Sequence, residues 1–161
     1  NVTPLRPWDD PDEMDEAMVQ YWNEIVREND KVYHLGDVVI NRRCLPILDR
    51  LNGSKVLIKG NHDIFKLKDY TPYFRDIRAY NVRSGLIMSH IPMHESSLRR
   101  FGCNIHGHLH SGRVMLDGAI DPRYYSVCVE KTNFRPIHLD EVIENIKAQG
   151  GEVNLKAQGN H

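Results

Sequence analysis

Four short apolar segments of this chain each lead into a cluster of glycine, aspartate, asparagine, serine or histidine residues. Apolar runs of this length predict β-strands, and turn-forming residues after them predict loops. The clusters are Gly36-Asp37, Gly60-Asn61-His62-Asp63, Ser89-His90 and Gly107-His108-Leu109-His110. Binding sites in α/β proteins form beyond the carboxyl ends of strands, where such clusters would meet. The pattern therefore predicts an α/β fold with a polar site assembled from four distant segments.

The remaining periodicity places the other elements along the chain. Asp10-Pro11-Asp12-Glu13 has the features of a helix start, and apolar residues at helical spacing follow it as far as Val26. Further helices are expected near residues 44–51 and from Asp140 to Gln149. Strands are expected at 31–35, 56–58, 77–82, 86–88, 104–106, 114–116, 125–129 and 136–138. Because helices alternate with strands early and strands dominate later, the expected fold class is an α/β sandwich with mixed sheets.

Length and composition fit one globular domain. A chain of 161 residues with 40% hydrophobic residues can bury a core, and no apolar run approaches the ~20 residues that cross a bilayer. The formal net charge of -1 argues against an extended basic surface for nucleic acid. The three cysteines, at positions 44, 103 and 128, form no C-x-x-C pair, so we expect reduced thiols with packing roles. Reduced thiols favour a cytoplasmic protein, and we expect no membrane partner. We assign residues 1–150 to the domain and 151–161 to a C-terminal tail.

The side chains in the four clusters are of metal-ligand type. Asp37 offers a carboxylate that can bridge two cations, Asn61 an amide oxygen, and His90 an imidazole. His108 and His110 are two residues apart, so in an extended backbone their side chains leave the same side, and each can reach a different one of two ions about 3.5–4 Å apart. Oxygen and nitrogen ligands together suit Mn²⁺, Fe or Zn²⁺ better than Ca²⁺. Singly, each cluster also fits an ordinary turn or an interior histidine, but together they indicate a metal-dependent hydrolase.

The order and spacing of these clusters resemble the calcineurin-like metallophosphoesterases, in particular the small single-domain members from bacteria and phages. Segments 32–37, 56–63 and 125–139 carry the likeness, which covers nearly the whole chain. The resemblance implies an α/β sandwich around a binuclear metal centre, with manganese favoured over iron, zinc or nickel. It also implies hydrolysis of small phosphoesters, phosphodiesters or nucleotide-type substrates, in which a metal-bound hydroxide attacks phosphorus.

By the same resemblance the site residues have distinct roles. Asp37 would bridge both metals and His110 would ligate one of them, while three side chains would complete the other site: Asn61, His90 and His108. His62 resembles the family's histidine that binds no metal and either protonates the leaving oxygen or stabilises the transferring phosphoryl group. Many relatives place an aspartate where this chain has Ile40, to orient that histidine. Asp63 takes over this orienting role, as a second catalytic residue, or else a backbone carbonyl holds His62 and Asp63 caps the loop or faces solvent.

One part of the family pattern has no counterpart here. The family opens with a strand carrying Asp-x-His, which supplies two ligands to the metal that His110 would bind, and no histidine precedes His34 in this chain. The stretch 1–7 resembles the segment that follows that strand. We therefore expect the domain without its first strand. A protein of residues 1–161 alone is expected to bind one metal well and the second weakly, with severely reduced catalysis.

Two other functions stay open from the sequence. A serine/threonine-type protein phosphatase would have a similar site, although the chain has no long insertion that would build a protein-docking surface. A degenerate metal-binding interaction module without turnover is consistent with the missing Asp-x-His. The cations that could meet a substrate phosphate, or form an ordinary charged surface, are Arg42, Arg43, Lys59, Arg99 and Arg100.

Overall fold

The computed structural model describes residues 7–156, and its first element is a helix. α1 (Pro11–Ile25) begins where the Asp10 carboxylate accepts a hydrogen bond from the Asp12 amide at 2.9 Å, which confirms the predicted start. Farther along the helix, the Trp22 indole N–H donates to the Asn52 carbonyl at 2.9 Å. This bond fixes α1 to the loop that leads into the first sheet.

A parallel three-stranded sheet follows α1. β1 (Lys31–His34), β2 (Ser54–Ile58) and β3 (Asp76–Arg78) lie in the order β1-β2-β3. The central strand β2 is buried over most of its length, as expected of a parallel strand with neighbours on both sides. The connecting elements η1 (Arg42–Arg50) and α2 (Leu67–Tyr70) pack against the sheet through an apolar cluster of Leu45, Leu48, Leu57, Tyr70 and Phe74.

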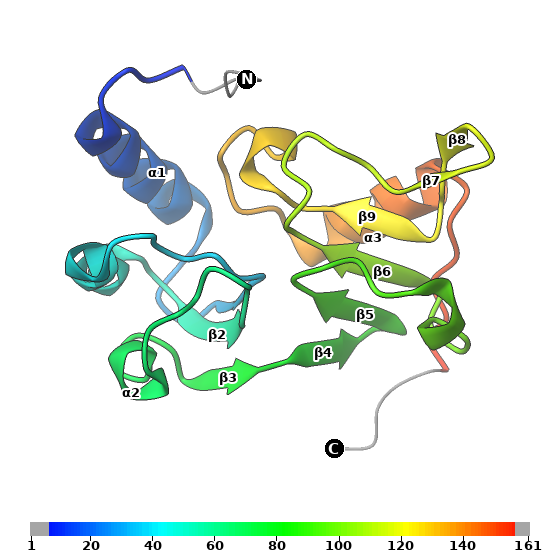
Figure 1. Ribbon diagram of the computed structural model, residues 1–161, viewed down its shortest axis with the longest axis horizontal. Helices are drawn as coiled ribbons and strands as arrows, with labels where there is room; N and C mark the ends of the chain where they lie inside the picture. The colour runs from blue at the N-terminus through cyan, green and yellow to red at the C-terminus, as the bar shows by residue number, and fades with distance from the viewer. Residues whose placement is uncertain (1–6, 157–161) are drawn as a thin grey trace.

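The second sheet has four strands and lies beside the first (Figure 1). Its order is β4 (Tyr80–Arg83), β5 (Leu86–Ser89), β6 (Cys103–His106) and β9 (Tyr124–Ser126); β4 and β5 are antiparallel and the other neighbours are parallel. α3 (Leu139–Ala148) packs on this sheet, and the shared core consists of Leu86, Met88, Cys103, Ile105, Val142 and Ile146. The shorter elements are η2 (Glu95–Ser97), η3 (Val129–Lys131), β7 (Met115–Leu116) and β8 (Ala119–Ile120).

The mixed α/β class predicted from the sequence is confirmed, but two early elements differ from their predicted form. The helix predicted near 44–51 is the 3₁₀ helix η1, and Pro46 within it donates no backbone hydrogen bond. The strand predicted at 77–82 is divided at Ala79, where the chain leaves β3 for β4. β3 belongs to the three-stranded sheet and β4 to the four-stranded sheet, so the chain passes from one sheet to the other at Ala79.

Two late strand predictions also need correction. β9 ends at Ser126 rather than at 129, because the chain turns into η3. Residues 136–138 form no strand, since the His138 side chain accepts a hydrogen bond from the Asp140 amide at 3.2 Å and caps α3. The segment between β9 and α3 is therefore mostly irregular.

The three cysteines are free thiols. Cys103 is fully buried in β6, and burial raises its pKa to about 12, so the packing role predicted for it is confirmed. Cys44 is exposed, and its predicted packing role is wrong, because η1 turns Leu45 and Leu48 inward instead. Cys128 is partly buried.

Both ends of the chain lie partly outside the described residues. Residues 1–6 contain most of the stretch that resembles the family, and residues 157–161 belong to the predicted tail. None of the helices within residues 7–156 combines the length and the apolar character that crossing a bilayer requires.

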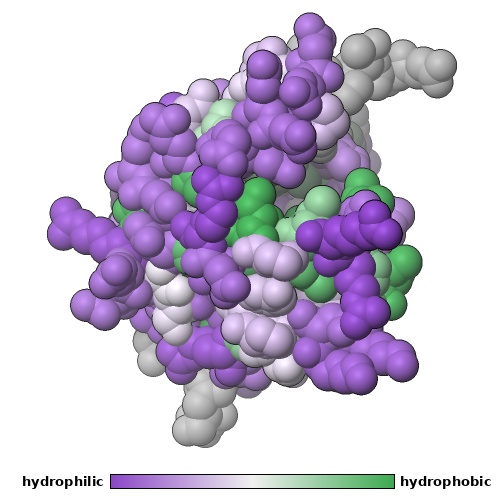
Figure 2. Space-filling view, turned by 90° about the vertical axis from the view of Figure 1, so that its left-hand side faces the viewer, coloured by the Kyte–Doolittle hydropathy of each residue, from purple (hydrophilic) through white to green (hydrophobic). Residues whose placement is uncertain are grey.

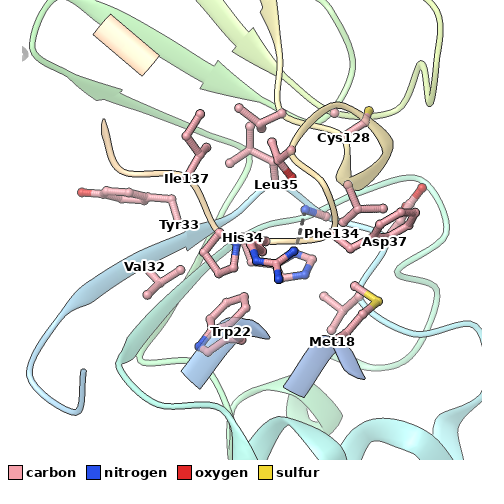
Figure 3. Close-up of a pocket in the computed structure, with 18 of the residues that line it drawn as sticks. Met18, Trp22, Val32, Tyr33, His34, Leu35, Asp37, Cys128, Phe134 and Ile137 are labelled. Atoms are coloured by element: carbon pink, nitrogen blue, oxygen red, sulfur yellow. Dashed lines mark hydrogen bonds between the residues drawn. The ribbon is translucent and has the colours of Figure 1, made fainter. Parts of the chain in front are cut away.

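An apolar groove of about 880 Å³ lies between α1, β1 and the segment that follows β9. β1 is an edge strand, so among the described residues its outer edge has no strand partner. Figure 3 shows Trp22, Val32, Leu35, Phe134 and Ile137 around the groove. On the side of the molecule that carries α1, Figure 2 shows apolar side chains in a hollow between hydrophilic ones. One end of the groove reaches the polar clusters at the strand ends.

Candidate metal centre

The four polar clusters follow the carboxyl ends of β1, β2, β5 and β6. β1 and β2 are parallel neighbours in one sheet, and β5 and β6 are parallel neighbours in the other. The strand ends of both sheets meet at the groove, where the turns at Gly36, Gly60 and His90 contact one another. The structure thus brings together segments that are far apart in the sequence.

Two glycines allow the first two turns to touch. Gly36 has φ +93°, and a Cβ added there would lie 2.6 Å from the Gly60 nitrogen. A Cβ added at Gly60 would lie 2.3 Å from the Asp37 Oδ1 atom. Because no side chain fits between these turns, both positions require glycine. Asp37 itself has φ +55°, so its backbone is held in a region that non-glycine residues seldom adopt.

The Asp63 carboxylate holds the two turns in place. It is buried and accepts hydrogen bonds from the backbone amides of Asp37 at 2.8 Å, Val38 at 2.9 Å and Gly60 at 2.7 Å. No hydrogen bond found within residues 7–156 joins this carboxylate to the His62 ring. Of the two roles predicted for Asp63, the geometry favours loop capping, and the orienting role is corrected accordingly. Three backbone donors use both carboxylate oxygens, so the Asp63 side chain serves the backbone of the two turns.

The His90 ring is oriented by a backbone carbonyl. Its Nδ1 lies 2.6 Å from the Leu35 carbonyl oxygen, so Nδ1 carries the proton and donates. The lone pair is then on Nε2, which lies 2.9 Å from Asn61 Oδ1 and 3.2 Å from Asp37 Oδ2. A hydrogen bond of this kind on the remote ring nitrogen is usual for histidines that bind metals.

His108 completes a four-residue cluster of Asp37, Asn61, His90 and His108. Its Nδ1 lies 2.9 Å from Asn61 Oδ1 and 3.2 Å from His90 Nε2. Donor atoms of Asp37, His90 and His108 all lie within 4.8 Å of one another. With metal–ligand bonds of about 2.1 Å, neighbouring ligand atoms of an octahedral ion are about 3.0 Å apart. The spacing and the chemistry of the four donor atoms therefore fit one divalent cation.

His110 is not part of this cluster. His108 and His110 have φ +67° and +52°, so the backbone is not extended here. The prediction that their side chains leave the same side of an extended segment is therefore wrong. The His110 side chain is 72% exposed, and its Nδ1 lies 3.3 Å from an oxygen of Glu130, whose side chain is only 8% exposed. Glu130 was missed in the sequence, although an acidic residue directly after the predicted strand 125–129 follows the same pattern as the other clusters.

His62 lies on the exposed side of the turn after β2. Its backbone N–H donates to Asp37 Oδ1 at 2.9 Å, while the other oxygen of this carboxylate faces His90. The backbone of His62 is therefore tied to the four-residue cluster, and its ring is accessible to a molecule that binds there.

Two other histidines, His34 and His106, lie next to the site and are held by contacts within the fold. His34 lies beside the Trp22 ring (Figure 3) and contacts the Phe74 ring on another side, and its Nδ1 accepts a hydrogen bond from the Gly36 amide at 3.2 Å. Burial lowers the pKa of the His34 imidazole, and burial likewise lowers the pKa of His106. Both rings are thus kept neutral at physiological pH and act as structural groups.

The fold and the site define a mixed α/β protein with a cluster of potential metal ligands at the strand ends. The chain is 34% identical over 148 residues to the uncharacterized protein MJ1445 of Methanocaldococcus jannaschii, a match that covers 88% of this chain and 80% of that protein. The chain therefore belongs to the same family as MJ1445.

A solved structure has a similar fold. The protein of unknown function AQ665 from Aquifex aeolicus superposes with a TM-score of 0.66 and 21% sequence identity, over 82% of this chain and 84% of that chain. At this level of identity the similarity concerns the fold alone. No protein-family model matches the chain.

Proposed function

We propose that this chain is a metal-dependent phosphoesterase of the calcineurin-like type, which hydrolyses small phosphoesters or phosphodiesters. The observation that carries the proposal is the convergence of Asp37, Asn61, His90 and His108, whose donor atoms are spaced for one cation. These residues come from four strand ends in both sheets, in the order and spacing expected for this superfamily. A cluster of mixed oxygen and nitrogen ligands suits Mn²⁺, which we favour over iron, zinc or nickel.

Hydrogen bonds within the chain already orient the proposed ligand residues without a cation. The Leu35 carbonyl directs the His90 lone pair into the cluster, and Asp63 fixes the backbone that carries Asp37. When bound, divalent cations in such a site lower the pKa of a coordinated water and offset negative charge on the phosphoryl oxygens. The chain's own contribution is to hold the ligand atoms at fixed separations, so that little reorganisation is needed on binding.

His62 is the proposed proton donor to the leaving oxygen. Its exposed position and its backbone hydrogen bond to Asp37 support this role, since a general acid must reach the departing group of a substrate at the cluster. The ring touches neither Asp63 nor any other hydrogen-bond partner found within residues 7–156. Its orientation would then be determined by the bound substrate.

The groove beside β1 supports the proposed sandwich fold. The groove is apolar, measures about 880 Å³ and lies along β1, whose outer edge has no strand partner among the described residues. We propose that the strand with Asp-x-His expected from the family resemblance fits here, pairs with the outer edge of β1, and brings its ligands toward His110. Reading the natural gene upstream of Asn1 tests this, and the absence of an in-frame Asp-x-His there would contradict it.

The first test measures metal binding and hydrolysis by the chain. After EDTA treatment and dialysis, Mn²⁺ titration should give one tight ion and a weaker second one, and bis-p-nitrophenyl phosphate should be hydrolysed slowly and only with metal. His62→Ala should lower this turnover about 100-fold or more with the Mn²⁺ affinity retained. His138→Ala, which alters an exposed histidine that caps α3, is the matched control. Two equally tight ions would contradict the expected weak second site.

The same experiment separates the alternatives. Faster hydrolysis of a phosphoserine peptide than of bis-p-nitrophenyl phosphate would favour a serine/threonine-type protein phosphatase. Tight Mn²⁺ binding without turnover of either substrate, in a protein that includes its natural upstream residues, would favour a degenerate interaction module. The observation that favours the interaction module is the exposed position of His110 outside the four-residue cluster.

A further inference from the structure

A second cavity, of about 620 Å³, lies against the four-residue cluster at the crossing between the sheets. Asn61 and His90 form the wall that it shares with the cluster, and the opposite wall comes from the chain around Ala79, where β3 passes into β4. The residues that matter for its chemistry are Lys59, Leu67, Tyr80 and Ile91, and we call this cavity the Tyr80 pocket.

Large apolar side chains are exposed around the Tyr80 pocket. Leu67 is 56% exposed, Tyr80 57% and Ile91 50%, although each comes from a different segment of the chain. Isolated exposed apolar residues are common, but a concave group of them beside a polar centre is typical of a binding site for an organic molecule. An aromatic ring among them favours a flat partner that can stack on it.

The charges in the pocket favour an anionic ligand. Lys59 lies in its wall, and no ion pair of its ammonium group is found within residues 7–156. The other cation, Arg78, is already engaged, because its guanidinium donates to Asp76 Oδ2 and Asn81 Oδ1, both at 2.6 Å. Lys59 is therefore the cation that can meet a phosphate, next to a surface that fits a planar ring.

We propose that the Tyr80 pocket binds the nucleoside part of a nucleotide-type phosphodiester whose phosphorus lies at the four-residue cluster. The shared wall of Asn61 and His90 places the pocket within one substrate molecule of the metal ligands. The base stacks on Tyr80 between Leu67 and Ile91, and Lys59 compensates the negative charge of the phosphate. This inference rests on the proposed phosphoesterase function and specifies the substrate class of that site.

The test compares two esters with the same leaving group and different retained groups. Thymidine 5′-monophosphate p-nitrophenyl ester carries a nucleoside, and methyl p-nitrophenyl phosphate carries none. With Mn²⁺, kcat/KM should be higher for the thymidine ester, and Tyr80→Ala should lower the ratio of the two values about tenfold, the usual scale of one base–aromatic stack. Tyr80→Phe should keep the ratio because the ring is retained.

Controls and binding measurements make the outcome decisive. Met115→Ala removes another exposed large side chain, on the β7–β8 hairpin, and should keep the ratio. An unchanged ratio in Tyr80→Ala would overturn the pocket assignment while leaving the phosphoesterase proposal intact. If a protein that includes its natural upstream residues hydrolyses neither ester, the phosphoesterase proposal fails, and calorimetry with thymidine 5′-monophosphate and methyl phosphate decides on the pocket. Tighter binding of the nucleotide that is lost in Tyr80→Ala would uphold the pocket, and equal affinities would overturn it.

Discussion

The two sides of the candidate centre are organised in different ways. In the four-residue cluster of Asp37, Asn61, His90 and His108, the ligand-bearing turns touch through glycines, and a buried carboxylate and a carbonyl hold the backbone and one ring in place. On the other side, His110 extends from an exposed loop and contacts Glu130 at 3.3 Å. The same residue type, histidine, is thus fixed in one place and loosely held only two positions later.

The difference shows that the geometry of a candidate ligand depends on its neighbours rather than on its residue type. Asp63 contributes no atom to the four-residue cluster, yet it bonds to the amides of Asp37, Val38 and Gly60 that shape it. The His110 side chain, by contrast, is 72% exposed and contacts one oxygen of Glu130 at 3.3 Å. Four substitutions test this comparison, and they follow in order of decreasing expected effect.

Asp63→Asn should have the largest effect. Asparagine offers one acceptor oxygen, and its amide group would face a backbone N–H that now bonds to the carboxylate. Hydrogen bonds to a charged group are worth about 1.5–3 kcal/mol each, so we expect the free energy of unfolding to fall by about 3 kcal/mol or more. Urea denaturation followed by circular dichroism measures this. Asp117→Asn, in an exposed turn that asparagine tolerates, should change stability little.

His90→Ala should abolish the tight Mn²⁺ site. Loss of a group that merely supports a ligand costs about 10–100-fold in metal affinity, so removal of the ligand itself should cost at least about 100-fold. Calorimetric titration of the EDTA-treated protein gives the affinity. An affinity equal to that of the wild type would show that the four-residue cluster is not the tight site.

Gly60→Ala tests the contact between the two turns. The added methyl group would lie 2.3 Å from Asp37 Oδ1, and this carboxylate would have to move. We expect a loss of Mn²⁺ affinity of about tenfold, comparable to the loss of a supporting group. Gly118→Ala is the control for a glycine replacement away from the site: at φ +80° the alanine strains the hairpin backbone, but its Cβ meets nothing within 4 Å and the hairpin is not part of the site, so the Mn²⁺ affinity should not change. If both variants bind Mn²⁺ equally well, the contact between the turns does not control the site.

His110→Ala should have the smallest effect on the tight ion. A side chain outside the ligand set acts on it only through weak, solvent-screened electrostatics, so we expect a change of less than about threefold. The same titration as for His90→Ala provides the comparison. A loss as large as that of His90→Ala would place His110 in the four-residue cluster and remove the distinction between the two sides.

Much of the fold follows from local sequence patterns. The start of α1 at Asp10-Pro11, the strands β1, β2, β5 and β6, and the polar cluster after each of them are all encoded within a few residues. A capping side chain or an apolar run acts over one turn of helix or one strand, so it can be read without knowledge of the partner segments. The mixed α/β class follows from their order.

Other features depend on residues that are distant in the sequence. The chain crosses between sheets at Ala79 because β3 pairs with β2 and β4 with β5, although a single strand was predicted there. The carboxylate of Asp63 serves the backbone because the turn of Asp37 packs against it, which the neighbouring His62 does not reveal. The sequence alone left both roles of Asp63 open.

The sequence by itself determined which residue types stand at the ends of the strands, and hence which side chains are available as metal ligands. The tertiary structure alone decided which of these residues meet. His108 joins Asn61 and His90 while His110 does not, because both histidines adopt positive φ values and the loop turns between them. Convergence of side chains requires contacts between segments that lie far apart in the chain, and such contacts exist only after the two sheets have packed together.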